Sequence, residues 1–271
     1  MHMEGQIMFF TRVKNSVIAR MQNWESKHFH LTKYGKKLAQ YRNIHKGERC
    51  FIIGNGPSLR AEDLQILHDN HIVTFASNRI FHIYDQTQWR PTYYVSEDLT
   101  ILQSIQDEVS NLTCKARFLP INHKWDGYVD VPGATWFYLD YSSDFEDTFG
   151  LSPDITKGIR CRGTVTMSCI QLALYMGFTE IYLLGVDHNY SSYIDSNGNL
   201  VVDQTVKDYF SGEYDNDFKN VIKRDLGSTT LSYLSAEKLS RRDGGFRVYN
   251  STRGGKLEVF ERVDFDTLFI L

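Results

Sequence analysis

The chain is short of proline, cysteine, long apolar runs and excess charge, and each shortage excludes a class of protein. It holds five prolines and four cysteines in 271 residues. The cysteines are scattered without a CxxC pair, so neither a disulfide framework nor a zinc site is expected. No apolar stretch reaches the roughly 18 residues that indicate a transmembrane helix. The first residues lack the pattern of a signal peptide, so we expect a cytoplasmic protein.

Charge and composition are those of an ordinary folded domain. Thirty basic side chains oppose 33 acidic ones, for a net charge of −3. This balance excludes nucleic acid as the main partner. Hydrophobic residues make up 42% and charged residues 23%, which excludes wholesale disorder. The aromatic content of 14% suits a protein that stacks rings or sugars, although a thick core would have the same composition.

The N-terminal segment predicts a helix from about residue 5 to residue 44. Apolar side chains recur in it at steps of three and four residues: Met8, Phe9, Val13, Val17, Met21 and Trp24. This stripe would pack on its own domain, on a second subunit or on a membrane surface, and Arg12, Lys14 and Arg20 keep the membrane alternative open. We favour a homo-oligomer, because pairing buries two apolar faces at once. Peripheral membrane contact is the alternative.

The rest of the chain alternates short apolar runs with helices. We expect strands at residues 50–53, 72–76, 93–95, 116–121, 136–139, 181–184 and 246–249, and helices at 57–67, 164–176, 202–223 and 230–241. Such alternation is typical of a parallel sheet covered on both faces. The prediction is an α/β protein: one Rossmann-like domain with a mostly parallel sheet at residues 47–271, preceded by an N-terminal helical extension at 1–46. The polar segment 189–211 is expected to be a loop or a lid.

A glycine-rich turn follows the first strand and has the sequence Gly54-Asn55-Gly56-Pro57-Ser58. We expect the two glycines to take positive φ and to let the backbone approach a ligand. Pro57 suits the first position of a helix, whose free N–H groups and dipole would bind a phosphate. The turn matches neither a Walker loop nor the GxGxxG dinucleotide fingerprint. Its place at the first βα junction favours a ligand site over a purely structural turn.

Other strand ends should meet this turn, because parallel strands deliver their carboxyl ends to one edge of the sheet. The polar residues expected there are Asn78, Ser96, Glu97 and Asp98, followed by Asp187, His188 and Tyr190. Thr164 and Thr166 open a helix at the same level and could bind an anionic or hydroxyl-rich part of a ligand. Each residue alone could be a helix cap or a turn residue.

These motifs together resemble a known family. Residues 54–59, 177–187 and 249–260 look like the bacterial family named after the archaeal 6-hydroxymethylpterin diphosphokinase, which includes flagellin glycosyltransferases of the motility accessory factor type. The same elements are similar to the Campylobacter-type sialyltransferases, which use CMP-sialic acid on a single Rossmann-like domain. The resemblance covers about residues 47–266. It is specific for the superfamily but not for the substrate.

The resemblance implies roles for individual residues. Asn55 and Gly56 would hold the phosphate and ribose of a donor, Asn78 would contact the nucleotide, and Thr164 lies near a donor-binding position. Tyr190 and Tyr193 match tyrosines that bind the phosphate and stabilise the leaving group.

The catalytic base stays open on this comparison. In the family, a histidine in the lid region acts as the general base. This chain has Asp208-Tyr209-Phe210 at the corresponding place. His188, Asp187 and Asp208 are therefore alternatives for that role.

Three functions remain open from the sequence. The first is a glycosyltransferase that moves a sugar, of sialic-acid type and from a CMP-activated donor, onto a cell-surface glycan without a required cofactor. The donor site would comprise Gly54, Asn55, Gly56, Ser58, Asn78, Ser96, Glu97, Asp98, Thr164, Thr166, Tyr190 and Tyr193. The second is a diphosphokinase, with Mg²⁺ held by Glu97, Asp98 and Asp187. The third is a non-catalytic nucleotide-binding module.

Overall fold

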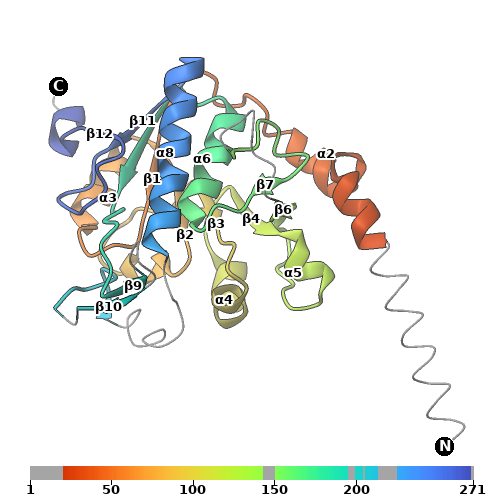
Figure 1. The fold of residues 1–271 in the computed structure, drawn as a ribbon, viewed down its shortest axis with the longest axis horizontal. Coiled ribbons are helices and arrows are strands. Elements are labelled where there is room, and N and C mark those ends of the chain that lie inside the picture. The colour runs from red at the N-terminus through yellow and green to blue at the C-terminus, as the bar shows by residue number, and fades with distance from the viewer. Residues whose placement is uncertain (1–20, 143–149, 195–198, 204, 213–224, 270–271) are drawn as a thin grey trace, which may run out of the picture.

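An eight-stranded sheet forms the centre of the molecule in the computed structural model, which describes residues 21–142, 150–194, 199–203, 205–212 and 225–269 (Figure 1). Its strand order is β12-β11-β8-β1-β2-β3-β4-β5, and every neighbouring pair in it is parallel. The strands are β1 (Arg49–Ile53), β2 (Val73–Ser77), β3 (Tyr93–Val95), β4 (Ala116–Pro120), β5 (Thr135–Phe137), β8 (Glu180–Leu184), β11 (Arg247–Asn250) and β12 (Glu261–Arg262). The predicted Rossmann-like α/β fold with a parallel sheet is confirmed.

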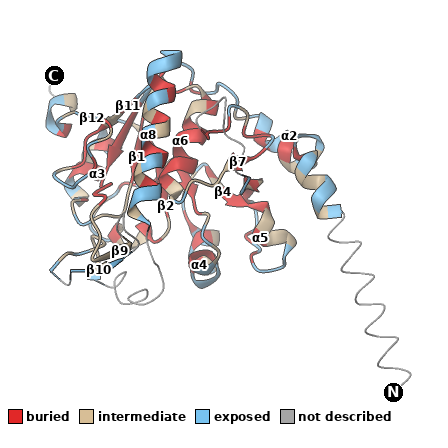
Figure 2. Ribbon diagram, viewed as in Figure 1, coloured by how far each residue is buried: buried red, intermediate tan, exposed pale blue. Residues whose placement is uncertain are grey.

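The two central strands, β1 and β8, are distant in sequence and paired in space. Ile53 lies opposite Leu184, as a single parallel sheet requires. Both strands are buried along almost their whole length, because a parallel sheet is covered on both faces. On one face, Tyr182 stacks between Phe51 and Tyr249 across three strands. Figure 2 shows the same pattern, with buried strands at the centre and exposed residues on the helices and loops around them.

Helix α6 (Val165–Met176) is the most deeply buried of the described helices. It contacts β1 and β3, and ten of its residues are buried, so it reads as apolar on all sides. The Thr164 side chain caps its start and Gly177, at φ 90°, ends it. In front of the sheet, α6 lies next to α8 (Leu226–Asp243), whose start Asp225 caps (Figure 1). The sheet domain also contains α3 (Ala61–Asp69), α4 (Leu99–Asn111), the short α5 (Ile121–Trp125) and the 3-10 helix η2 (Ile80–Ile83).

The N-terminal segment is helical but is not the one continuous helix that its periodicity predicts. Residues 21–27 are helical, a 3-10 turn η1 (Phe29–Leu31) follows, and α2 (Lys33–Ala39) begins anew after Thr32. Thr32 is extended and its hydroxyl caps the new helix by accepting from Gly35 N. Phe29 and Leu38 are fully buried, and α2 packs on β5, so this part of the predicted extension shares the core of the sheet domain.

The first residues of the predicted apolar stripe, 5–20, lie outside the described residues. Within the described part, Met21 and Trp24 are 60% and 56% exposed. Self-association or membrane contact through this stripe stays a prediction, as does a domain boundary at residue 46. No helix in the described ranges is long and apolar enough to cross a bilayer.

Two predicted helices differ from the structure. The helix expected at 57–67 begins only at Ala61, because residues 56–58 form a turn. The helix expected from residue 202 is wrong for the described residues before Gly212, since Leu200–Val202 forms strand β10 and 205–211 is irregular. The part of that prediction at 213–223 lies outside the described residues.

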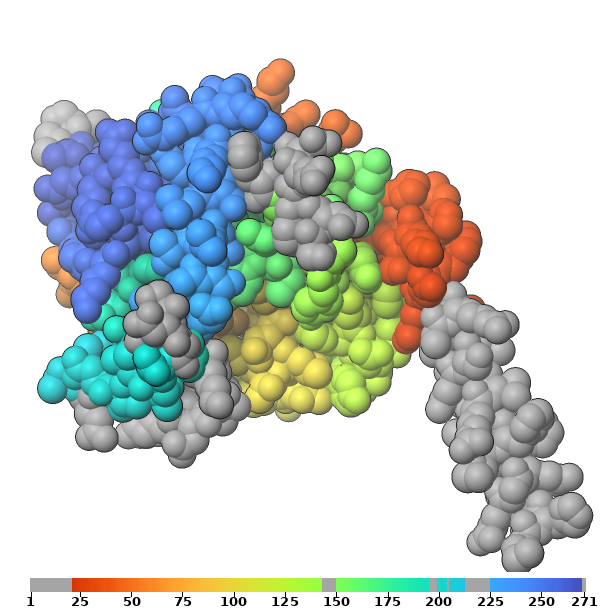
Figure 3. All heavy atoms as spheres, in the orientation of Figure 1, coloured from red at the N-terminus to blue at the C-terminus, as the bar shows by residue number. Residues whose placement is uncertain are grey.

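The segment predicted as a loop or lid contains a small hairpin. Strand β9 (Ser192–Ile194) pairs antiparallel with β10, and the hairpin protrudes beside the lower end of α8 (Figure 3). A second short pair, β6 (Leu139–Asp140) with β7 (Ile159–Arg160), leads from β5 to α6. The chain finishes with η3 (Phe265–Phe269), whose aromatic rings contact Phe51 on the sheet.

Candidate functional site

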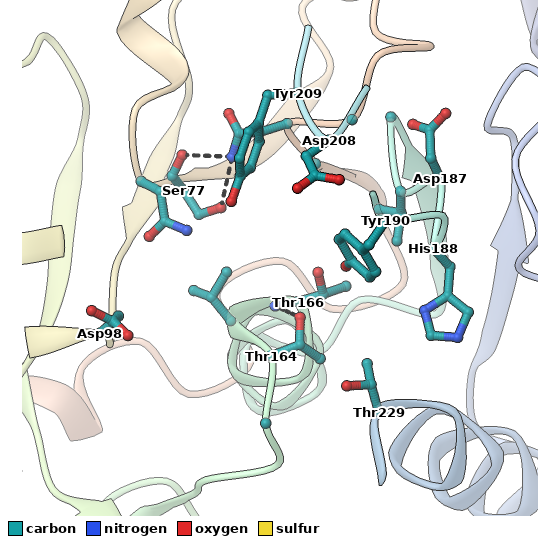
Figure 4. A pocket seen from close by; sticks show the side chains of 18 of the residues that line it. Ser77, Asp98, Thr164, Thr166, Asp187, His188, Tyr190, Asp208, Tyr209 and Thr229 are labelled. Carbon is teal, nitrogen blue, oxygen red and sulfur yellow. Dashed lines mark hydrogen bonds between the residues drawn. The ribbon is translucent and has the colours of Figure 1, made fainter. Parts of the chain in front are cut away.

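A cavity of about 390 Å³ opens at the carboxyl edge of the central strands. Such an edge is the usual ligand crevice of an open α/β sheet. The cavity is lined by residues that follow β1, β2, β3 and β8, by the starts of α4, α6 and α8, and by the segment around Asp208. Figure 4 shows these side chains arranged around one opening. The predicted site residues that line it are Gly54, Asn55, Gly56, Asn78, Glu97, Asp98, Thr164, Thr166, Asp187, His188, Tyr190 and Asp208.

The glycine turn after β1 is shaped by protein packing. Neither Gly54 nor Gly56 has a positive φ, which corrects that expectation. Their N–H groups donate to Leu184 O at 2.8 Å and to Gly185 O at 2.9 Å. A Cβ on Gly54 would overlap Gly185 O, and one on Gly56 would overlap the Asp187 carboxylate. Glycine is required here because two backbone segments approach closely.

Asp187, which follows β8, is hydrogen-bonded to this turn. Its Oδ2 accepts from Ser58 Oγ at 2.7 Å and from Ser58 N at 3.4 Å. Burial raises the pKa of Asp187, against the hydrogen bonds from Ser58, which lower it. Ser58 thus acts on the cavity through Asp187, since it does not line the cavity itself. Because α3 begins at Ala61, its N-terminus does not supply the predicted phosphate donors.

Residues 252–256, near the C-terminus, also contact the segment that follows β8. Thr252 Oγ1 accepts from Val186 N at 3.1 Å, and Lys256 N donates to Asp187 O at 2.7 Å. A Cβ on Gly255 would lie 2.8 Å from Asp187 O, so this position also requires close backbone approach. Three motifs far apart in sequence therefore meet at Asp187.

Two asparagines present a polar edge to the cavity. Asn55 Nδ2 donates to Ser77 O at 3.1 Å, whereas its buried Oδ1 has no partner among the described residues. Asn78 lies in the left-handed region at φ 53°, and its Oδ1 accepts from Ser96 Oγ at 2.9 Å. The fully buried Ser96 lies outside the cavity lining and orients Asn78. Because Asn78 Oδ1 is occupied, its amide nitrogen is the group left to donate, while Asn55 Oδ1 accepts.

The start of α6 faces the cavity through residues 163–166. Thr164 Oγ1 accepts from Thr166 N at 3.4 Å, as the dashed line in Figure 4 marks. No acidic residue occupies its first turn. By contrast, Asp98 caps α4 and Asp225 caps α8, so carboxylates already stand at those two helix starts. A helix N-terminus attracts anions, and α6 is the helix start here that carries no charge of its own.

Glu97 follows β3 and brings a carboxyl group into the cavity lining. Ser168, on the first turn of α6, donates its hydroxyl to Glu97 Oε2, and the Glu97 carbonyl accepts from His123 Nε2 at 2.8 Å. Burial raises the pKa of Glu97 to about 7, an effect that the Ser168 hydrogen bond opposes and the nearby Asp98 reinforces.

His188 occupies the end of the cavity beside α8, opposite Asp98 (Figure 4). It adopts φ 51°, a left-handed conformation that histidine takes more readily than most residues. Nε2 lies 2.8 Å from Thr230 Oγ1, whose hydroxyl donates to Leu226 O. Nε2 must therefore carry the proton, which leaves the buried Nδ1 as a free acceptor without a partner among the described residues. Burial lowers the pKa of His188, so the ring is neutral at pH 7.

Tyr190 and Tyr193, the two tyrosines to which the resemblance gives a role, lie in different places in the structure. Tyr190 lines the cavity close to His188, with the two ring centroids 6.3 Å apart. Tyr193 lies in β9 and does not line the cavity. Asp208 accepts from Ser191 N and, at 3.1 Å, from Ser191 Oγ, so its carboxylate ties two loop segments together. Phe210 N donates to Asn55 O at 3.1 Å, which anchors the same loop to the glycine turn.

Sequence reasoning missed several lining residues, chiefly Tyr209, Tyr233 and the start of α8. Tyr233 is buried, which raises the pKa of its phenol against hydrogen bonds from Thr166 and Thr164. The spacing Asp225-x-x-Ser228 is a capping signal that would have placed the α8 start correctly. Tyr233 carries no such signal, because a tyrosine on a helix face is usually a core residue.

Each of the three carboxylates proposed for Mg²⁺ has a hydrogen-bond partner within the protein. Asp98 caps α4, Asp187 bonds Ser58, and Glu97 accepts from Ser168. Across the described ranges, no group of three or more His, Cys, Asp and Glu side chains is placed to hold a metal ion. Mg²⁺ bound to a nucleotide can use one or two carboxylates together with phosphates and waters, so the diphosphokinase alternative stays a prediction.

With this geometry in place, the sequence can be compared with known proteins. Residues 22–193, more than half of the chain, match the family described as 6-hydroxymethylpterin diphosphokinase MptE-like. The chain belongs to this family. The resemblance stated from the motifs is thereby confirmed, and the MptE-like region includes most of the described N-terminal segment. The sequence matches no curated protein significantly.

Two of the solved structures that match this chain are glycosyltransferases. The MAf glycosyltransferase from Magnetospirillum magneticum AMB-1 has a TM-score of 0.50 and 16% identity, covering 88% of this chain and 39% of its own. This chain therefore spans well under half the length of that protein. The sialyltransferase CstII from Campylobacter jejuni, solved with cytidine-5'-monophosphate, has a TM-score of 0.45 and 16% identity, covering 80% of this chain and 85% of its own. At such identity the likeness to MAf concerns the fold alone.

Proposed function

We propose that this MptE-like protein is a glycosyltransferase that moves a sugar from a nucleotide donor to a hydroxyl of a glycan acceptor. The observation that carries the proposal is the uncharged start of α6, which opens into the same cavity as a neutral, buried histidine. A helix N-terminus can bind the phosphate of a donor, and a neutral imidazole can take a proton from an acceptor hydroxyl. These two features of one cavity support the proposal.

The donor nucleotide would lie between α6 and the asparagine edge. Its phosphate would be held by backbone N–H groups at the start of α6, and its ribose or base would bond Asn55 Oδ1 and the Asn78 amide nitrogen. We propose CMP as the nucleotide and a sialic-acid-like sugar, onto a cell-surface glycan. Both choices rest on the motif resemblance rather than on the cavity.

His188 is proposed as the base in preference to the two aspartates. Asp187 and Asp208 are engaged in hydrogen bonds that hold loops, whereas His188 lines the cavity and its buried Nδ1 has no partner among the described residues. The variant His188→Asn removes the base and keeps a residue that tolerates positive φ. We expect kcat to fall by about 10²–10⁴-fold, the usual contribution of a general base. Steady-state transfer kinetics measure this, with the exposed His68→Gln on α3 as the matched control; a loss under about tenfold would move the role elsewhere.

The function is tested by binding and turnover together. A thermal-shift panel of CMP, UDP, GDP and ATP, with Mg²⁺ and with EDTA, should show stabilisation by one nucleotide in both conditions. Release of that nucleotide from its sugar donor should then occur in EDTA. Stabilisation by ATP that requires Mg²⁺ would favour the diphosphokinase alternative. Binding of a nucleotide without turnover of any donor would favour the non-catalytic module.

A further inference from the structure

Glu97 is a titratable group inside the cavity for which the proposed function has no use so far. It stands at the end of β3, and the next residue, Asp98, lies across the opening from His188 (Figure 4). Glu97 and His188 are thus two different titratable groups that line the same cavity. Glycosyl transfer has two proton steps, one at the acceptor oxygen and one at the departing phosphate, and His188 accounts for the first alone.

The surroundings of Glu97 place its carboxyl group beside the proposed phosphate site. Ser168, which donates to Glu97 Oε2, is one helical turn after Thr164, the capping residue at the start of α6. The same helix turn thus faces the phosphate position with its N-terminus and orients Glu97 with a hydroxyl. The buried side chain of Ser168 has zero exposure, so the orienting bond is shielded from water.

Within the part of the chain that the structure describes, no cation pairs with this carboxyl group. None of the ion pairs among the described residues involves Glu97, and its charged neighbour on the chain is another acid, Asp98. Burial without a cation favours the protonated form, and the resulting pKa of about 7 lies near neutral pH. A pKa near the working pH is the condition under which a side chain is an efficient proton donor.

We infer that Glu97 is a catalytic residue, the general acid that protonates the phosphate oxygen as the sugar leaves it. The inference rests on the proposed function. The bond between the anomeric carbon and the phosphate oxygen breaks, and its electron pair stays on that oxygen, which receives the Glu97 proton. The acceptor oxygen bonds the anomeric carbon and gives its proton to His188 Nδ1. Exchange with water then returns a proton to Glu97 and removes one from His188.

Two groups with opposite requirements give a bell-shaped pH dependence. His188 must be neutral, so activity falls when pH drops below its lowered pKa. Glu97 must be protonated, so activity falls as pH rises through its pKa of about 7. The alkaline side of the profile is therefore the signature of Glu97.

The experiment combines kinetics with a direct titration of the full-length protein. Nucleotide release from CMP-N-acetylneuraminate, UDP-N-acetylglucosamine and GDP-mannose is followed from pH 5 to pH 9 in the wild type and in Glu97→Gln, Ser168→Ala and Glu108→Gln. Glu108 is an exposed glutamate on α4 and serves as the matched control. In parallel, ¹³C NMR of labelled glutamate side chains measures the Glu97 pKa without any substrate, with Glu97→Gln assigning the resonance.

We expect Glu97→Gln to lower kcat by about 10²-fold or more, to leave KM nearly unchanged and to abolish the alkaline fall. Ser168→Ala should move the alkaline fall to higher pH, because the Ser168 hydrogen bond lowers the pKa of Glu97 in the wild type and its removal raises that pKa. Glu108→Gln should match the wild type. NMR should show one glutamate that titrates near pH 7, and thermal unfolding should show that each variant is folded.

Opposite results overturn the inference. If Glu97→Gln keeps kcat within about tenfold and retains the alkaline fall, Glu97 is not the acid. A Glu97 resonance that is fully ionised at pH 5 excludes the role on its own. If the wild type releases nucleotide from none of the three donors, the proposed function fails and takes the acid role with it. Turnover by the wild type with an unaltered Glu97→Gln profile overturns the acid role alone.

Discussion

The glycine turn after β1 and the start of α6 face the same cavity, but their backbone N–H groups differ in their hydrogen-bond partners. In the turn, the N–H groups of Gly54 and Gly56 donate to the chain after β8, and Ser58 donates to Asp187. At α6, the first N–H groups have no intrahelical acceptor, and the capping residue Thr164 is uncharged. A glycine-rich turn at a strand end can therefore be a packing device, while a plain helix start nearby is the better anion site.

The largest expected effect tests the packing side of this comparison. In Gly56→Ala, the new methyl group would overlap the Asp187 carboxylate and lie 2.8 Å from Gly185 O. We expect a loss of about 3 kcal/mol in the free energy of unfolding, at the upper end of typical overpacking costs. Chemical denaturation measures it. Gly245→Ala is the control, because nothing lies within 4 Å of its added Cβ. An unchanged stability together with lost nucleotide binding would restore the turn as a phosphate site.

The second effect is the contribution of Glu97 to the pH dependence of the free energy of unfolding. Its folded pKa of about 7 lies above the ordinary value of 4.5, so the folded protein holds this proton more tightly than the unfolded chain. Wild-type stability should therefore fall as pH rises from about 4.5 to 7, and Glu97→Gln should escape that fall. The difference is at most about 3 kcal/mol at 1.4 kcal/mol per pKa unit, less solvent screening. Denaturation at pH 4.5 and pH 8 measures it, and parallel curves for the two proteins would contradict it.

The smallest expected effect tests whether the start of α6 binds the phosphate. Val165 is the first residue of α6 and lines the cavity. Val165→Asp places a carboxylate where the phosphate is expected, which should weaken nucleotide binding about tenfold or more, or about 1.4 kcal/mol. The same substitution should stabilise the helix slightly, because an acid suits a helix start. Calorimetry with CMP measures binding, and the neutral Val165→Asn is the control. Equal affinities for the two variants would place the phosphate elsewhere.

Much of the fold could be predicted from the sequence because its strands carry a local signal. Short apolar runs such as 50–53 and 181–184 can be buried only in a covered parallel sheet, and they are central strands here. Helix starts were predicted less well. Pro57 suggested a start that the structure moves to Ala61, and regular apolar spacing hid the break at Thr32. Both errors arise where a tertiary contact or a cap overrides periodicity.

For the candidate site, too, the sequence predicted some features and not others. Strand order along the sheet brings Asn78, Glu97 and His188 to one edge, and their positions after predicted strands were enough to place them there. Their chemical states were beyond sequence reasoning. That His188 has a free Nδ1 depends on Thr230, and that Glu97 titrates near neutral pH depends on burial beside Ser168.

The sequence by itself determined the parallel sheet, the family and the edge at which the polar residues gather. These follow from patterns that neighbouring residues carry, namely apolar runs, turns and motifs. Only the tertiary structure decided that Gly56 packs against Asp187, that α6 rather than α3 offers an open helix start, and which groups hold protons. Hydrogen-bond partners and desolvation come from residues far apart in the chain, and no local pattern contains them.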